Sequence, residues 1–399
     1  VGLYYPGSVG TLDQLNTGAS NKNSWGVVAG DFNGDGFPDF VTASYGRALN
    51  GIWLSEGEAH WAPGGAWAGV PSDENEDWTT NLNAQCYCEL VPAAEDCEPV
   101  PPPPSYFGCD STSGLRWNHD YDRERFRLAG NTFTHATGDV DNDGDLDLVE
   151  ADIVHWDVGA SSDPSQLLVN DSHGVFARPL TLPAAHGEMV AWNDGDMTAA
   201  IFDFDDDGRQ DIYIGSSDYE GTRGRLYHQD AGGAFTPVAV ADGIDHPRSQ
   251  GLTVADFDSD GDLDVAVGHG TARCGGDSSC YPTAEVHLFR NDRPPANSVA
   301  LTLVGAPGTN RAAIGARVSV TADGMTQTQE VSGGYGHYGL QNDLVLHFGL
   351  GAACEVERVE VRWPDAAGTV EVWEGVRANY AVKLTQGGAI DYTPVAAPK

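Results

Sequence analysis

The chain has 399 residues, of which 40% are hydrophobic and 20% charged, an ordinary balance for a folded protein of two or three domains. Its formal net charge of −38 argues against nucleic acid and anionic membranes as partners, because both require a basic face. No stretch approaches the ~18 consecutive apolar residues of a membrane span. Because the chain starts at Val1 without a charged-then-apolar leader, we expect a mature secreted protein whose signal peptide has been removed, although a chain trimmed in another way would begin similarly.

One nine-residue pattern occurs four times, beginning at Asp31, Asp139, Asp203 and Asp256. Aspartate or asparagine occupies positions 1, 3, 5 and 9, and glycine occupies position 6, where it permits the sharp turn that lets these oxygens converge. Calcium accepts several oxygen ligands in flexible geometry, and a backbone carbonyl at position 7 would complete each site. We therefore predict about four Ca²⁺ ions. The predicted ligands are Asp31, Asn33, Asp35, Phe37 and Asp39 in loop 1; Asp139, Asp141, Asp143, Asp145 and Asp147 in loop 2; Asp203, Asp205, Asp207, Arg209 and Asp211 in loop 3; and Asp256, Asp258, Asp260, Asp262 and Asp264 in loop 4.

An EF-hand shares the first half of this pattern, but it also requires a glutamate at position 12 and flanking helices. Position 12 is Thr42, Glu150, Ile214 and Val267, so only the second loop fits. The segments on either side of every loop are short, apolar and rich in β-branched residues, which is typical of buried strands. The sequence therefore predicts loops that join two strands.

A repeated calcium-binding turn between buried strands, as in the stretch from Val28 to Asp39 and its three copies, resembles the FG-GAP/VCBS repeat family. The resemblance implies an all-β fold in which residues 1–292 form a calcium-binding β-propeller. It further implies seven blades, of which the sequence shows four clear repeats, with structural calcium in the hairpin between the first two strands of a blade.

Residues 61–118 interrupt the repeats, and we interpret them as a Cys/Pro-rich insertion stapled by disulfides. Tryptophans are enriched around this segment, where they would stack on sugar rings, anchor a protein partner or fill a small core. These tryptophans are Trp53, Trp61, Trp67, Trp78 and Trp117.

The seven cysteines favour an oxidising compartment. Cys86, Cys88, Cys97 and Cys109 allow three disulfide pairings, and the spacing of Cys86 and Cys88 disfavours the alternative of a zinc site. Two further predictions concern the rest of the chain: Cys274 pairs with Cys280, and Cys354 is a buried free thiol.

Residues 293–399 lack the acidic loops and alternate apolar with polar residues, which predicts a small β-sandwich or barrel. The ordered motifs Asn310-Arg-Ala-Ala-Ile-Gly-Ala-Arg-Val, His347-Phe-Gly-Leu-Gly and Val361-Arg-Trp-Pro364 resemble the ASPIC/UnbV domain. That domain follows FG-GAP/VCBS repeats in secreted acidic proteins such as the cartilage acidic protein-like group. The loop Tyr335-Gly-His-Tyr338-Gly departs from the family, which more often has small residues there, so a ligand of this loop would differ too.

The sequence contains no Gly-x-Ser-x-Gly elbow, no phosphate-binding Gly-x-x-x-x-Gly-Lys and no His-Glu-x-x-His zinc motif, and we therefore predict a protein that is not an enzyme. The leading hypothesis is a secreted, calcium-stabilised binding or adhesion protein that engages an extracellular protein or glycan through its propeller loops and insertion. Two alternatives remain: a self-assembling structural subunit bridged by calcium, and a glycan-binding or glycan-acting protein.

Overall fold

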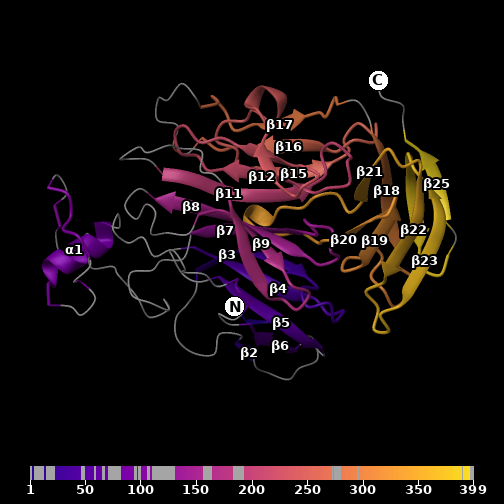
Figure 1. The fold of residues 1–399 in the computed structure, drawn as a ribbon, viewed down its shortest axis with the longest axis horizontal. Helices are drawn as coiled ribbons and strands as arrows, with labels where there is room; N and C mark the ends of the chain where they lie inside the picture. The colour runs from indigo at the N-terminus through magenta and orange to yellow at the C-terminus, as the bar shows by residue number, and fades with distance from the viewer. Residues whose placement is uncertain are drawn as a thin grey trace.

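The structure, a computed structural model, is almost entirely built of β-strands (Figure 1). It describes residues 2–3, 13–14, 23–45, 50–57, 60–64, 68–70, 82–93, 97, 100–105, 108–109, 131–155, 164–182, 193–271, 273, 280–293, 296–388 and 390–395. The short strands β1 (Gly2–Leu3) and β2 (Asp13–Gln14) pair with each other. No helix among the described residues is long and apolar enough to cross a membrane.

Each of the four repeats forms an antiparallel blade, and three of the blades have four strands. Blade 1 comprises β3 (Asn23–Gly30), β4 (Asp39–Tyr45), β5 (Gly51–Gly57) and β6 (His60–Pro63). Blade 2 comprises β7 (Thr132–Gly138), β8 (Asp147–His155), β9 (Gln166–Asn170) and β10 (Phe176–Thr181). Blade 3 comprises β11 (Asn193–Phe202), β12 (Asp211–Ser216), β13 (Arg225–Gln229) and β14 (Phe235–Pro237), followed by the 3-10 turn Val240–Asp242. Blade 4 comprises β15 (Gly251–Ala255), β16 (Asp264–Gly268) and β17 (Val286–Phe289).

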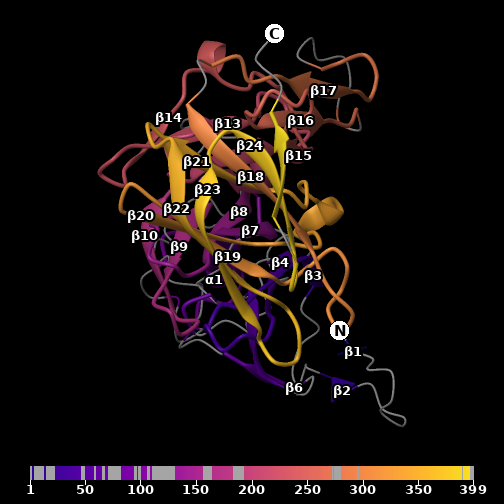
Figure 2. The ribbon, with the colours of Figure 1, turned by 90° about the vertical axis from the view of Figure 1, so that its right-hand side faces the viewer.

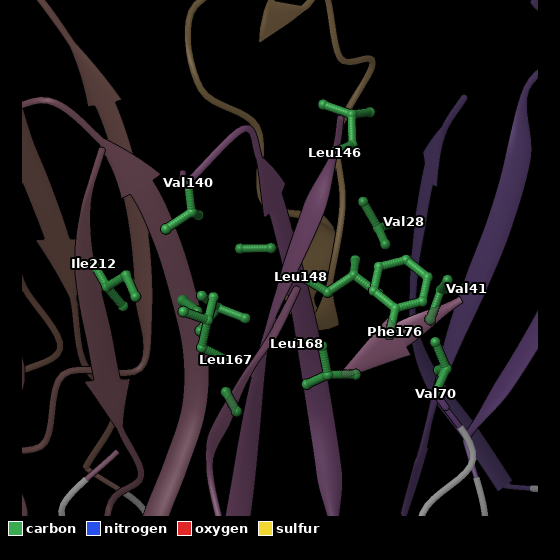
Figure 3. Close-up of a cluster of buried hydrophobic side chains, with 14 of the residues drawn as sticks. Val28, Val41, Val70, Val140, Leu146, Leu148, Leu167, Leu168, Phe176 and Ile212 are labelled. Carbon is green, nitrogen blue, oxygen red and sulfur yellow. The ribbon is translucent and has the colours of Figure 1, made fainter. Parts of the chain in front are cut away.

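The blades are held together by apolar contacts between their faces. The strands are runs of β-branched and aliphatic residues, and every residue of β12 is buried, as expected for a strand covered on both faces. The largest core extends through blades 1, 2 and 3: Val28 and Phe176 lie on one side of Leu148, and Ile212 lies on the other (Figure 3). Blades 2 and 3 are also joined edge to edge, because β8 pairs with the start of β11.

The expected all-β propeller class is confirmed. The described residues form four blades, which matches the four repeats recognised in the sequence, whereas the family resemblance implies seven.

The C-terminal residues form a separate sandwich of two four-stranded sheets with its own core around the buried Trp363. One sheet contains β18 (Asn297–Val304), β21 (Leu346–Gly351), β24 (Tyr380–Thr385) and β25 (Ile390–Pro394), with β18 and β24 parallel. The other sheet contains β19 (Arg317–Ala322), β20 (Met325–Glu330), β22 (Glu355–Arg362) and β23 (Val370–Arg377). The sandwich lies at one end of the propeller (Figures 1 and 2).

A loop of the C-terminal domain, residues 332–343, runs past the first strands of the four blades, and we call this segment the plug. The amide of Gly336 donates to the carbonyl of Val27 in β3 at 2.7 Å, and the hydroxyl of Tyr335 donates to the carbonyl of Ala199 in β11 at 3.1 Å. The amide of His337, in the short turn His337–Gly339, donates to Oγ1 of Thr134 in β7 at 3.0 Å.

The plug also bonds to blade 4, because the amide of Val254 donates to Oδ1 of Asn342 at 3.0 Å. The plug of the C-terminal domain therefore crosses the space enclosed by the inner strands of the propeller, a contact that no sequence pattern predicted.

The predicted insertion differs from the structure at its start, because β6 extends to Pro63 and completes blade 1. The described part of the insertion contains the helix α1 (Leu82–Leu90), which no sequence pattern predicted. Trp53 stacks on Phe40 with a ring separation of 5.0 Å and Trp61 packs edge-on at 6.0 Å, so these two tryptophans pack on blade 1. The other three tryptophans of that group lie outside the described residues.

The cysteines of the insertion form two disulfides, Cys86–Cys109 and Cys88–Cys97, which settles the three possible pairings and excludes a zinc site made from them. Cys280 is also disulfide-bonded, while Cys274 lies outside the described residues. The prediction for Cys354 is wrong in one respect: the thiol is free but exposed, because it lies on the surface just before β22.

Candidate metal centres

The four acidic loops occupy equivalent places, each joining the first strand of a blade to the second. The residue before each loop pairs with the aspartate at position 9, as Gly30 does with Asp39 and Phe202 with Asp211. Since every first strand leads toward the same end of the propeller, the loops gather there, and the C-terminal domain covers that end (Figure 1).

In each loop, the carboxylate at position 1 accepts a hydrogen bond from the amide of the glycine at position 6. The amide of Gly36 donates to Asp31 Oδ2 at 2.8 Å, and the amide of Gly208 donates to Asp203 Oδ2 at 2.7 Å. The four loop glycines have φ between 85° and 101°, a conformation that an L side chain rarely adopts. The sequence therefore specifies this turn locally through glycine and the preceding oxygens.

The position-9 aspartates have a second role, which the sequence analysis missed. In loop 2, one oxygen of Asp147 accepts from the amide of Val140 at 2.8 Å, and the other accepts from the amide of Asn170 in β9 at 2.9 Å. The same pair of hydrogen bonds recurs at position 9 of the other three loops, with Asp39, Asp211 and Asp264 as acceptors. These carboxylates therefore pin each loop to the third strand of its blade.

Each loop also holds one buried carboxylate oxygen without a hydrogen-bond partner. These atoms are the Oδ1 atoms of Asp31, Asp139, Asp205 and Asp258. A buried ionised oxygen without a partner is costly, and a coordinated cation removes that cost. The donor set fits a hard, oxygen-preferring cation.

Three loops bring their carboxylates within 4.8 Å of one another. The groups are Asp139, Asp141 and Asp147; Asp203, Asp205 and Asp207; Asp256, Asp258 and Asp260; and a further set of Asp205, Asp211 and His228. His228 is a candidate ligand that sequence reasoning missed, because it belongs to β13 and lies outside the loop pattern.

Loop 1 is different, because position 3 is Asn33 and a cationic side chain reaches into the loop. Nη1 of Arg362, from β22, lies 2.9 Å from Asp31 Oδ2, and its guanidinium covers Gly36. The described residues of this loop form no carboxylate group of the kind seen in the other three.

At position 7, the side chains have different surroundings. The ring of Phe37 is exposed, Arg209 pairs with Asp207, Asp145 accepts from the hydroxyl of Ser172, and Asp262 is buried. Their backbone carbonyls remain the predicted donors.

The C-terminal domain contacts all four loops. The carboxylate of Glu330 accepts from the amide of Asp31 at 3.3 Å in loop 1, and the amide of Thr328 donates to Asp139 Oδ2 at 3.1 Å in loop 2. Arg317 joins these two loops by donating to the carbonyls of Asp31 and Gly144.

The other two loops meet the same domain. In loop 3, the amide of Gly351 donates to the carbonyl of Asp206 at 2.7 Å, and His347 Nε2 lies 2.5 Å from the carboxylate of Asp206. In loop 4, the hydroxyl of Ser298 donates to the carbonyl of Gly261 at 3.3 Å. The end of the propeller that could hold metal is therefore also the interface between the two domains.

Comparisons with protein families agree with this architecture. The FG-GAP repeat family matches residues 23–54, the FG-GAP-like repeat family matches residues 203–267, and the family described as ASPIC and UnbV matches residues 306–391. The chain carries FG-GAP repeats followed by an ASPIC/UnbV domain.

No curated protein matches the chain. A solved structure described as a lectin from Agrocybe aegerita, which recognises non-reducing terminal N-acetylglucosamine, is 14% identical. The match covers 88% of this chain and 80% of that chain with a TM-score of 0.32, which is too low to carry an argument about this protein.

A cavity of about 1150 Å³ lies between the FG-GAP blades and the ASPIC/UnbV domain. The position-1 aspartates Asp31, Asp203 and Asp256 line it together with Arg317 and Glu330. The cavity therefore reaches the position-1 aspartates of loops 1, 3 and 4 while the two domains remain in contact.

Without metal, several of the loop carboxylates hold a proton more tightly than a free aspartate does. Burial, reinforced by the neighbouring loop aspartates, raises the pKa of Asp39 and Asp139 to about 7 and that of Asp147 to about 8. Because an unfolded aspartate titrates near 3.8, the folded metal-free protein binds more protons than the unfolded chain between these values, and its stability falls as the pH rises.

We therefore predict that the melting temperature of metal-stripped protein falls between pH 5 and pH 8. A divalent cation should reverse the trend, because protons then compete with the ion for the same oxygens. Thermal melts at unit pH intervals would test this, with Asp147→Asn as the comparison. The asparagine keeps only one of the two acceptor oxygens, which lowers the stability at every pH, but it cannot titrate, so the slope should be shallower. A melting temperature that rises with pH in the stripped protein would contradict the prediction.

Proposed function

We propose that the protein is a secreted, non-enzymatic binding or adhesion protein in which calcium, one ion in each acidic loop, holds the ASPIC/UnbV domain against the propeller. The rigid pair would then present the opposite end of the propeller and the disulfide-bonded insertion to an extracellular protein or glycan. Calcium suits these loops better than magnesium, because it accepts several protein oxygens in flexible geometry.

The observation that carries the proposal is the contact of all four loops with the ASPIC/UnbV domain of the same chain. The carboxylates of Asp31 and Asp139 belong to the acidic loops and also contact residues of the ASPIC/UnbV domain. An ion that neutralises them therefore acts on the domain interface as well as on the blade. This arrangement favours an internal role for calcium over the bridging of separate chains in an assembly.

The disulfides Cys86–Cys109 and Cys88–Cys97 support an oxidising compartment, and with it the extracellular location that we propose. The two disulfides also stabilise the insertion, which would let it present a fixed surface to a partner beside the propeller.

Loop 3 allows a test with a matched pair of variants. Asp205→Ala removes a buried oxygen that has no other partner and should reduce the number of bound calcium ions from four to three. Asp205→Asn reproduces the residue found at the same position of loop 1, Asn33, and should keep all four ions with weaker affinity. Calcium per chain, measured by equilibrium dialysis and elemental analysis, distinguishes the two outcomes.

If the Asp205→Ala variant still bound four calcium ions, loop 3 would not be a calcium site. Binding of no calcium by the unaltered protein would overturn the proposed role of the loops as a whole.

A further inference from the structure

Aromatic side chains gather at the end of the propeller opposite the acidic loops, around the tip of the plug. We call this group the distal cluster. It receives residues from all four blades, because Trp25 lies near the start of β3, Tyr45 ends β4 and Phe133 lies in β7. The remaining members follow β12 and β16 or belong to the plug. Its members are Trp25, Tyr45, Phe133, Tyr219, Arg273, His337 and Tyr338.

The imidazole of His337 joins the rings of this cluster. Its centroid lies 5.4 Å from that of Trp25, 5.0 Å from that of Phe133 and 4.0 Å from that of Tyr338. Two polar contacts fix its position: its amide donates to Thr134, and Nδ1 lies 3.2 Å from the carbonyl of Trp25. The rings are therefore held in place by the plug and the first two blades before any ligand arrives.

Tyr338 adopts a backbone conformation that a tyrosine rarely takes, with φ at 67° and ψ at 0°. Its ring does not offset this cost by burial, because the residue is 55% exposed, and the nearby Trp25 is 48% exposed. Strain that packing does not explain is a mark of functional positions. The plug thus presents an aromatic ring to solvent at the centre of the propeller end.

A polar edge adjoins these rings. The guanidinium of Arg273 lies 4.6 Å from the centre of the Tyr219 ring and forms an ion pair with the buried carboxylate of Asp218. The buried Arg248 supports both residues by donating to their backbone carbonyls at 2.8 and 3.2 Å. The half-exposed Arg273 therefore offers hydrogen-bond donors in a fixed position, while the carboxylate that pairs with it is buried beneath it.

Among the described residues of the distal cluster, the exposed charge is the guanidinium of Arg273, and the buried Asp218 neutralises it. The cluster itself therefore favours neither an anionic nor a cationic ligand. Burial lowers the pKa of His337, so its imidazole adds no charge at neutral pH. A matching ligand is uncharged, has an apolar face for the rings and carries groups that accept hydrogen bonds from the guanidinium.

We propose that the distal cluster binds a neutral saccharide, with one sugar ring against Tyr338 and Trp25 and its hydroxyl groups on Arg273. This inference rests on the proposed function, since it names the ligand class of the surface that the propeller would present.

The test uses the full chain in saturating calcium and three families of trisaccharide probes of different charge. The neutral probes are cellotriose, maltotriose and galactotriose; the charged ones are the trimers of galacturonic acid and of glucosamine. Tryptophan fluorescence and isothermal titration calorimetry report binding. We expect at least one neutral trimer to bind at millimolar or lower concentration and neither charged trimer to do so.

Tyr338→Gly removes the ring and suits the positive φ, so the variant should fold normally and bind the neutral trimer about tenfold more weakly. Asp323→Gly is the matched control, because Asp323 also has a positive φ, of 48°, but lies in the hairpin between β19 and β20. It should bind as the unaltered protein does.

Absence of binding by all three neutral trimers, stronger binding of a charged trimer, or unchanged affinity in Tyr338→Gly would each overturn the inference. Calcium content and melting temperature measured on the same samples keep this failure separate from a failure of the proposed calcium sites.

Discussion

Calcium-depleted protein should unfold in two thermal transitions, and saturation with calcium should merge them into one at higher temperature. The reason lies in the interface: the loop carboxylates that face the ASPIC/UnbV domain repel one another when no cation is bound. Each domain keeps a core of its own, around Phe176 in the propeller and around Trp363 in the sandwich, so each can melt separately once the interface weakens.

The expected effect is large. A site contributes ~2.7 kcal/mol when the free ion is 100-fold above its dissociation constant. Four such sites in a chain of 399 residues raise the melting temperature by on the order of 10 °C, given about 2.1 cal/mol/K of unfolding entropy per residue.

Differential scanning calorimetry of metal-stripped protein, with calcium or with magnesium added back, measures this effect. Magnesium is the control, because it retains its water ligands and should restore much less stability. One unchanged transition in all three conditions would show that the loops do not couple the domains.

The second prediction with a large effect concerns Gly349 of β21, which packs directly on loop 3. A Cβ atom at this glycine would lie 2.1 Å from Asp203 Oδ2 and 2.5 Å from backbone atoms of Asp206. The backbone of the loop is held by its own hydrogen bonds and cannot move aside easily. Gly349→Ala should therefore lift the ASPIC/UnbV domain from loop 3 at a cost of about 1–3 kcal/mol.

This variant should lose one calcium ion, because Asp203 is displaced, and its melting curve should resemble that of partly depleted protein. Gly251→Ala is the matched control: nothing lies within 4 Å of the added carbon, and the backbone there is not left-handed. Wild-type melting and calcium content in Gly349→Ala would show that the close contact is not needed for seating the domain.

The parts of the fold that rest on local patterns could be predicted from the sequence. The loops are specified by oxygen-bearing side chains and a glycine within nine residues, and their flanks by short apolar runs, so the blades and the acidic clusters were expected. The alternation of apolar and polar residues in β18 to β25 likewise predicts a sandwich.

Contacts between segments that are far apart in the sequence produce no local pattern of this kind. Arg362 and Asp31 are separated by 331 positions in the chain, and Thr328 and Asp139 by 189. The residues around each of them therefore give no local sequence pattern that predicts the contact. For the same reason, His228 was missed as a neighbour of Asp211. The exposed Cys354 was misjudged because its surroundings depend on how the second sheet turns at β22.

The plug has a consequence for the biosynthesis of the protein. The inner strands of all four blades bond to residues 332–343, which are synthesised after every blade. The nascent propeller therefore emerges with polar groups such as the carbonyl of Val27 still lacking their final partners. The hydrogen bonds that join the inner strands to the plug can therefore form only after the first half of the C-terminal domain has been synthesised, which makes this contact a late step of folding.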